Sequence, residues 1–297
     1  MAFFIEVLAG GLLAGVMYSL VALGFVLIYK ASGVFNFAQG AMVFFAALTF
    51  VSLAERGVNA WLALAITLAV MVLLGLATER VVLRPLVNQP PITLFMATIG
   101  LTFVLEGLSQ LVWGSQPHGL ELGVPDVPIE WLSQQANINI SQFDLFASAV
   151  AGILVAVLAV FFQKTRIGRA LRAVADDHQA ALAVGIPLKQ IWGIVWAVAG
   201  FVALVAGLMW GVRNGVQYAL TFVALKALPV LILGGFESIA GAIVGGLIIG
   251  ASEKLAEVYL GPYVGGGIES WFAYVIALGF LLVRPQGLFG EKIIERV

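Results

Sequence analysis

Residues 61–78, WLALAITLAVMVLLGLAT, decide the class of fold, because no charged side chain occurs anywhere in the stretch. A helix of about 20 mostly apolar residues is long enough to cross the hydrocarbon core of a bilayer. The stretch therefore predicts a membrane-spanning helix, and similar apolar stretches recur along the rest of the chain.

The composition excludes several classes of protein. Of the 297 residues, 62% are hydrophobic and 10% are charged, and the mean hydropathy is +1.06. Soluble domains carry about 25% charged residues, so this chain has too little charge to cover a surface in water. High hydrophobicity excludes intrinsic disorder. The net charge of −1 offers no basic face for nucleic acid, and a chain without cysteine forms no disulfide or thiolate site.

Nine apolar segments predict an all-α polytopic membrane helix bundle that occupies residues 1–297 as a single transmembrane domain. Two of them, 34–53 and 219–235, are interrupted by polar residues, Gly or Pro. We expect these two to be broken or re-entrant, which is tolerated only where protein buries the backbone. The prediction is therefore eight or nine spans, drawn from residues 7–29, 34–53, 61–78, 92–113, 143–162, 191–211, 219–235, 239–256 and 268–283.

The distribution of Lys and Arg predicts the orientation, since cytoplasmic loops carry an excess of both. Residues 114–142 hold acids but no Lys or Arg, so we expect this loop outside the cell. Residues 163–190 are rich in both and should be cytoplasmic. With nine spans the N-terminus lies outside and the C-terminus inside. The residues then placed inside are Lys30, Arg80, Arg84, Lys164, Arg166, Arg169, Arg172, Lys189, Arg284, Lys292 and Arg296, against Arg56, Arg213 and Lys254 outside.

The cytoplasmic loop 163–190 contains a predicted short helix. Asp176 or Asp177 can cap its N-terminus, Gly185 suits the left-handed position after its last turn, and Pro187 prevents continuation. About two helical turns held outside the membrane are typical of a segment that fits a groove on a partner. The preceding Arg166, Arg169 and Arg172 share one helical face and indicate an anchor to anionic lipid.

Five motifs, in order along the chain, resemble those of the branched-chain amino-acid ABC permease family, most closely its H-type subunit. Gln179, Ala180, Ala181 and Gly185 match the family's E-A-A-x-x-x-G coupling motif, with Gln in place of Glu. The other four motifs are NFAQG at 36–40, ERVVLRPL at 79–86, LGGFESIAGA at 233–242 and RPQGLFG at 284–290.

The resemblance implies an ABC importer in the bacterial inner membrane. It implies a second homologous permease, two cytoplasmic ATPase subunits that dock on a coupling helix containing Asp177, Gln179, Ala180, Ala181 and Gly185, and an extracytoplasmic binding protein. Because no G-x-x-x-x-G-K-[ST] motif is present, the chain itself is not expected to be an enzyme that hydrolyses ATP. No cofactor is implied.

The sequence departs from the family at three positions. Gln39 replaces a common His, Glu237 a Gly and Ala240 a Pro. Branched-chain amino acids are the default substrate, but urea, short amides and carboxylates are carried by relatives of the same architecture.

Polar residues within apolar spans are the candidates for the substrate pathway, because they are costly unless they face a cavity or a partner. Glu106 and Lys226 could meet the ammonium and carboxylate of a zwitterion, or form a structural ion pair, and Lys226 could instead extend to the interface. Thr98 and Thr102 share a face with Glu106, although each could bond its own backbone. The candidate set is Asn36, Gln39, Thr98, Thr102, Glu106 and Lys226.

Glycines recur at four-residue spacing, which lets helices approach closely in lipid. The pairs are Gly11 with Gly15, Gly207 with Gly211, Gly241 with Gly245 and Gly246 with Gly250. Ordinary bundle packing and a subunit interface or narrow pathway at 241–250 both remain open.

Two other classes of function compete with the importer. A stand-alone secondary transporter or channel would show inverted repeats, and no convincing repeat is present. A membrane metalloenzyme or hydrolase would need spacings such as H-E-x-x-H or G-x-S-x-G, which the sequence lacks. His118 and His178 lie far apart in sequence, and no metal site is expected.

Overall fold

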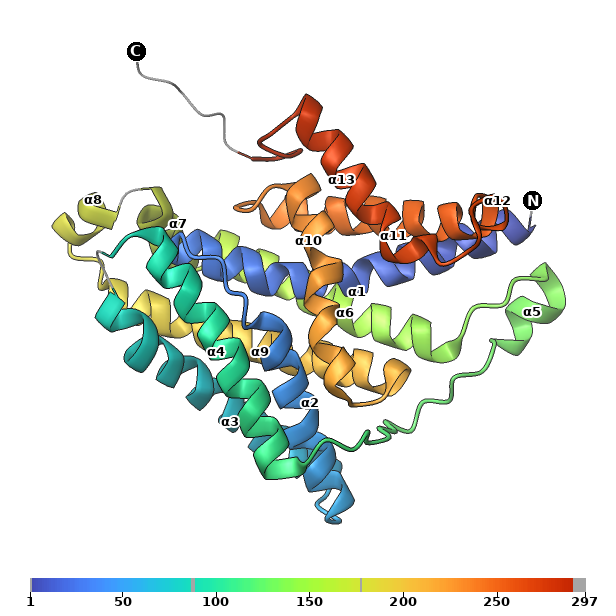
Figure 1. Ribbon diagram of the computed structural model, residues 1–297, viewed down its shortest axis with the longest axis horizontal. Helices are drawn as coiled ribbons and strands as arrows, with labels where there is room; N and C mark the ends of the chain where they lie inside the picture. The colour runs from blue at the N-terminus through green and yellow to red at the C-terminus, as the bar shows by residue number, and fades with distance from the viewer. Residues whose placement is uncertain (1, 87–88, 177, 291–297) are drawn as a thin grey trace. The chain divides into compact units, whose positions relative to one another are not determined.

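A computed structural model describes residues 2–86, 89–176 and 178–290. These residues form helices and connecting loops without any β-strand, which confirms the all-α prediction (Figure 1). The α-helices are α1 Ala2–Ser32, α2 Gln39–Glu55, α3 Ala60–Ala77, α4 Pro91–Trp113, α5 Glu130–Ala136, α6 Gln142–Lys164, α7 Arg166–Asp176, α8 His178–Ala183, α9 Leu188–Asn214, α10 Val223–Gly234, α11 Ile239–Tyr259, α12 Gly261–Val264 and α13 Phe272–Val283. A π-helical turn, η1 Thr78–Leu83, and three 3₁₀ turns, η2 Arg84–Leu86, η3 Tyr218–Phe222 and η4 Ile268–Ser270, complete the set.

Within the described residues, six helical segments are long and apolar enough to cross a membrane. Three further apolar helices are shorter, and two of these correspond to the segments that the sequence marks as interrupted. The predicted span 34–53 becomes helical only from Gln39, and 219–235 divides into η3 and α10. The predicted span 268–283 is also shorter than expected, because its first residues form the turn η4.

The described chain falls into two compact units. Unit 1 comprises Met1–Ala22, Leu122–Val157 and Leu225–Val297, and unit 2 comprises Leu23–Glu121 and Leu158–Ala224.

In unit 2, α9 packs against α2 and α3, and α2 also packs against α4 and η3. Glycines form the closest contacts. A Cβ atom added to Gly75 would lie 2.5 Å from the carbonyl oxygen of Trp196, and one added to Gly207 would lie 2.5 Å from that of Val43. Backbone therefore meets backbone at these crossings, as is typical of helices packed in lipid.

In unit 1, glycines bring α11 against its neighbours. A Cβ on Gly15 of α1 would lie 2.5 Å from the Gly246 carbonyl oxygen, and one on Gly11 would lie 2.7 Å from that of Gly250. A Cβ on Gly245 would lie 2.7 Å from the carbonyl oxygen of Val230 in α10. Three of the four glycines predicted at 241–250 are thus packed against helices of the same chain, and Gly241 faces Gly234 in the same way.

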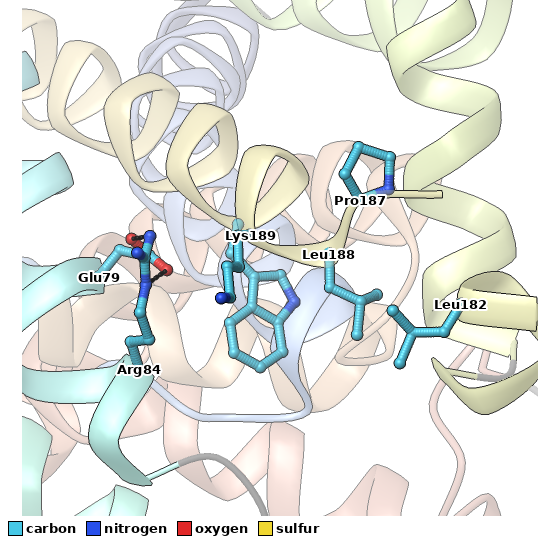
Figure 2. Close-up of a pocket in the computed structure, with 7 residues that line it drawn as sticks. Glu79, Arg84, Leu182, Pro187, Leu188 and Lys189 are labelled. Atoms are coloured by element: carbon cyan, nitrogen blue, oxygen red, sulfur yellow. Dashed lines mark hydrogen bonds and ion pairs between the residues drawn. The ribbon is translucent and has the colours of Figure 1, made fainter. Parts of the chain in front are cut away.

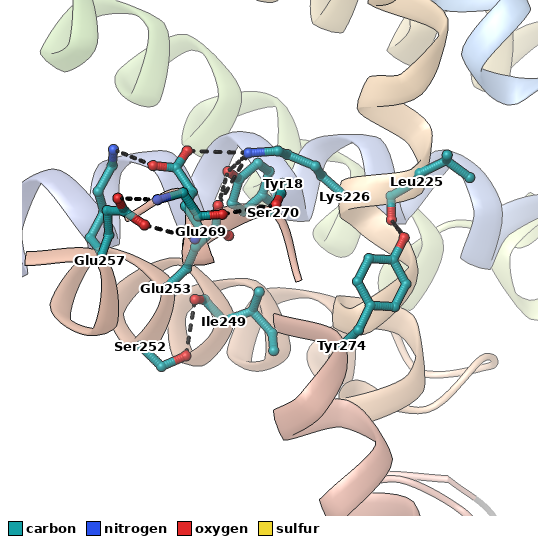
Figure 3. Close-up of polar contacts among 12 residues, drawn as sticks. Tyr18, Leu225, Lys226, Ile249, Ser252, Glu253, Glu257, Glu269, Ser270 and Tyr274 are labelled. Atoms are coloured by element: carbon teal, nitrogen blue, oxygen red, sulfur yellow. Dashed lines mark hydrogen bonds and ion pairs between the residues drawn. The ribbon is translucent and has the colours of Figure 1, made fainter. Parts of the chain in front are cut away.

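The helix α10 contains Pro229, which has no N–H to donate to the carbonyl of Leu225 four residues earlier. The Tyr274 hydroxyl of α13 donates to that carbonyl oxygen at 2.7 Å (Figure 3). A side chain thus satisfies the backbone acceptor that proline leaves free, which a lipid environment requires.

Candidate functional site

The cytoplasmic loop predicted at 163–190 is mostly helical. The helix α8 ends as the sequence predicts: Gly185 has φ +85, and the backbone N–H groups of Gly185 and Ile186 donate to the carbonyls of Leu182 and Ala181. This pair of hydrogen bonds forms a Schellman motif, in which a glycine adopts the left-handed conformation without the steric cost that a Cβ atom would bring. Gln179, Ala180 and Ala181 lie in α8, whereas Asp177 lies outside the described residues.

The arginines of α7 have a role that the sequence did not indicate. Arg172 donates from its guanidinium to the carbonyl oxygens of Phe162 at 2.7 Å and Gln163 at 3.2 Å, and Arg169 donates to that of Lys164 at 3.5 Å. The last carbonyls of a helix have no intrahelical donor. Two of the three arginines expected to anchor lipid therefore cap the end of α6.

A cavity of about 450 Å³ lies beside α8 in unit 2. Figure 2 shows Glu79 and Arg84 on one side of it and Leu182, Leu188 and Pro187 on the other. Lys189 and Trp192 complete the lining. The motif at 79–86, the short helix α8 and the start of α9 thus border the same space.

The Glu79 carboxylate joins the π-helical turn η1 to the first residue of η2. It accepts from Arg84 Nε at 3.0 Å and from Arg84 Nη2 at 2.7 Å, a bidentate geometry that gives both strength and orientation. The Glu79 side chain is buried and that of Arg84 is about one-third exposed. From the sequence, residues 79–86 were identified only by their resemblance to the family motif, and the ion pair between Glu79 and Arg84 was not predicted.

Asn36, Gln39 and Thr98 meet at the break before α2. Asn36 Oδ1 accepts from the Ala38 N–H at 3.1 Å, its Nδ2 donates to Gln39 Oε1 at 3.3 Å, and the Thr98 hydroxyl accepts from the Phe37 N–H at 3.3 Å. These contacts satisfy backbone and side-chain groups where the helix is interrupted. Among the described residues, nothing pairs with Gln39 Nε2, which is buried.

On α4, Thr102 donates to the Thr98 carbonyl at 3.0 Å, which is the backbone bond that the sequence left open as an alternative. One helical turn further on, the Glu106 carboxylate accepts from the Tyr218 hydroxyl of η3 at 3.3 Å. Tyr218 was not predicted, because nothing in the sequence relates residue 218 to residue 106.

Lys226 of α10 belongs to a dense polar network in unit 1 (Figure 3). Its ammonium donates to Glu253 and Glu269 at 3.2 Å each and lies 3.5 Å from the Tyr18 hydroxyl, which itself donates to Glu253 at 3.1 Å. The Lys226 ammonium thus has two carboxylate partners, which favours a structural ion pair for Lys226 over a pathway role. Glu106 and Lys226 therefore take their partners from different units.

Glu269 sits in the turn η4 and joins Lys226 to Lys254, whose ammonium donates to it at 3.0 Å. Burial raises the pKa of the Glu269 carboxyl, but the hydrogen bond and charge of Lys254, together with Lys226, outweigh burial and hold the pKa below its ordinary value. Glu257 fixes the same turn by accepting from the backbone N–H groups of Gly267 and Glu269, each at 2.9 Å. Glu253 was a missed signal, since it is an ionisable residue inside an apolar span.

Comparison with known proteins covers nearly the whole chain. Residues 7–284 match the family described as branched-chain amino acid transport system / permease component. The chain is 28% identical to the high-affinity branched-chain amino acid transport system permease protein LivH of Salmonella typhimurium and to BraD of Pseudomonas aeruginosa, with 99% of this chain and 98% of each relative covered. It is 30% identical to the probable branched-chain amino acid transport permease protein LivH of Methanocaldococcus jannaschii, with 96% and 92% covered.

The relatives are transport permeases, and the family resemblance predicted from the five motifs is confirmed. The chain belongs to the family of ABC permeases known as the branched-chain amino acid transport system permease component.

Proposed function

We propose that the chain is the H-type permease subunit of an ABC importer that carries hydrophobic, chiefly branched-chain, amino acids across the bacterial inner membrane. The observation that carries the proposal is the family match over residues 7–284. The names of the similar LivH and BraD proteins supply the substrate class. A second homologous permease, two cytoplasmic ATPases and an extracytoplasmic binding protein complete the importer.

We further propose a single permease domain with eight or nine spans. In this topology the loop 163–190 and the C-terminus are cytoplasmic, and the loop 114–142 and the N-terminus are outside. The asymmetry of Lys and Arg supports this orientation.

The helix α8 is proposed as the coupling helix that receives the ATPase movement. It is short, its last turn is closed by Gly185, and only three residues separate Gly185 from Lys189 on the first turn of α9. Leu182 of α8 and Val184, which follows the helix, are exposed, whereas Ala181 of α8 is buried. A displacement of α8 would therefore pass directly to α9 and to the cavity bordered by Glu79 and Arg84.

Single-cysteine variants test this proposal. Because the chain has no cysteine, an introduced thiol is the only one on this subunit. Val184→Cys places a thiol on the exposed residue after α8, and Val127→Cys places one in the loop 114–142 as the matched control. In cells expressing the importer, Val184→Cys should cross-link to an ATPase subunit and resist a membrane-impermeant maleimide. Val127→Cys should react with the maleimide and give no such cross-link. The reversed pattern contradicts the assignment.

A further inference from the structure

In the part of the chain that the structure describes, the buried Glu106 carboxylate has no cationic partner. It lies within the apolar helix α4, its residue is 8% exposed, and its hydrogen-bond partner is the neutral Tyr218 hydroxyl at 3.3 Å. Among the residues that the structure describes, no Lys, Arg or His forms an ion pair with it. This sets it apart from Glu79, Glu253 and Glu269, each of which is paired with a basic side chain.

An ionised carboxylate without a counter-charge is costly in a membrane helix. Acidic side chains at such positions are normally paired with a cation, because a buried charge left alone is strongly destabilising. One neutral hydroxyl supplies only part of the compensation that a cation would give. The arrangement at Glu106 is therefore suited to a cation that arrives with a ligand.

The surroundings of the carboxylate fit a ligand that is both cationic and apolar. Tyr218 is 45% exposed, and its ring lies 5.7 Å from that of Phe222 and 6.5 Å from that of Phe44, measured between centroids. Phe222 is also exposed. An aromatic face attracts an ammonium group within about 6 Å, and the exposed Phe222 ring offers apolar surface to an aliphatic side chain, whereas Phe44 is buried behind Tyr218.

We propose that Glu106 and Tyr218 form a binding site for the ammonium group of the transported amino acid, with the exposed aromatic ring of Phe222 receiving its side chain. This inference rests on the proposed function. It restricts the substrate class of the importer to compounds that carry a positively charged amine. Lys226 does not provide the complementary site for the substrate carboxylate, because Glu253 and Glu269 already compensate its charge.

The test uses the detergent-solubilised importer without its binding protein, so that weak binding to the permease is observed directly. Saturation-transfer NMR would compare three compounds with the same branched side chain. Leucine carries both charged groups, 3-methylbutan-1-amine carries only the amine, and 4-methylpentanoate carries only the carboxylate. We expect the wild-type complex to bind the two amines and Glu106→Gln to weaken both at least tenfold. Ser109→Ala is the matched control, since Ser109 is a buried polar residue of α4 whose hydroxyl bonds its own helix.

Equal amine binding by wild type and Glu106→Gln overturns the proposal, as does preferential binding of the carboxylate-only compound by the wild type. If Glu106→Gln fails to assemble, Tyr218→Leu decides, because it keeps the carboxylate and removes the aromatic face beside it. A severalfold loss of amine binding then supports the site, and wild-type binding overturns it. If the complete importer transports no amino acid but still binds the amines, the proposed function fails while the amine site stands.

Discussion

Replacing Lys226 by Met separates a structural ion pair from a pathway residue. The substitution keeps the length of the apolar stem but removes the ammonium that Glu253 and Glu269 share. The Glu253 side chain is 3% exposed, so its carboxylate would lose its cation in a buried place, while Glu269 would keep Lys254. The network of unit 1 should therefore be destabilised chiefly through Glu253.

The expected magnitude lies between two limits. Removing one partner of a fully buried ion pair costs about 3–5 kcal/mol, and an exposed pair contributes about 1 kcal/mol or less. Because the Lys226 side chain is 35% exposed, we expect Lys226→Met to lower the free energy of unfolding by about 2–3 kcal/mol. The loss in free energy of unfolding in the double variant Lys226→Met/Glu253→Gln should be smaller than the sum of the losses in the two single variants by at least about 1 kcal/mol.

Unfolding in mixed micelles, followed by circular dichroism as denaturing detergent is added, measures these differences. Lys189→Met is the matched control, because Lys189 is an exposed lysine for which the described chain offers no ion pair. Transport per assembled complex should stay near the wild-type rate in Lys226→Met. A variant as stable as wild type, or a stable complex that no longer transports, refutes the structural assignment.

Three further predictions concern packing, coupling and pH. Gly15→Leu should prevent stable folding, because its Cβ atom would lie 2.5 Å from a backbone oxygen. Gly10→Leu should fold, because a Cβ atom at Gly10 meets nothing within 4 Å. Equal yields of folded protein from the two variants would refute the packing of α1 against α11. Gly185→Ala should impair ATP-driven uptake, because a left-handed backbone strains an alanine at the end of α8 by about 1–2 kcal/mol. Gly57→Ala, at a similar φ of +78 and also with open space, should leave uptake unchanged. Unchanged uptake in both variants would count against α8 as the coupling element. The folded-state pKa of Glu269 is lowered, so its contribution to stability is present above the ordinary glutamate value of 4.5 and is lost as pH falls through the folded pKa. The melting temperature should therefore fall less on acidification in Glu269→Gln than in the wild type. Identical pH profiles of the two proteins would contradict this prediction.

Local chemistry made part of the fold predictable. The apolar segments, the end of α8 at Gly185 and the interruption before Gln39 depend on neighbours within a few residues, so composition and turn rules are enough to place them. The helix that starts late at Gln39 is a case in point, because Asn36 bonds the Ala38 N–H only two residues on.

The polar pairs depend instead on how distant helices pack. Glu106 and Tyr218 are 112 positions apart, and Lys226 is 27 positions from Glu253 and 43 from Glu269. Charge alone marked Glu106 and Lys226 as unusual, but not which of them already had counter-ions. The capping of α6 by Arg172 was missed for the same reason, since its acceptors lie about ten residues earlier and are reached only once α7 folds back.

Substrate uptake by the reconstituted importer distinguishes an ABC permease from a stand-alone transporter. Proteoliposomes containing this chain, its partner permease and both ATPases, supplied with ATP and leucine-loaded binding protein, should accumulate leucine against its gradient. Vesicles that lack the ATPases should accumulate none. Leucine flux through the purified chain without any ATPase subunit would contradict the account and identify a stand-alone transporter or channel.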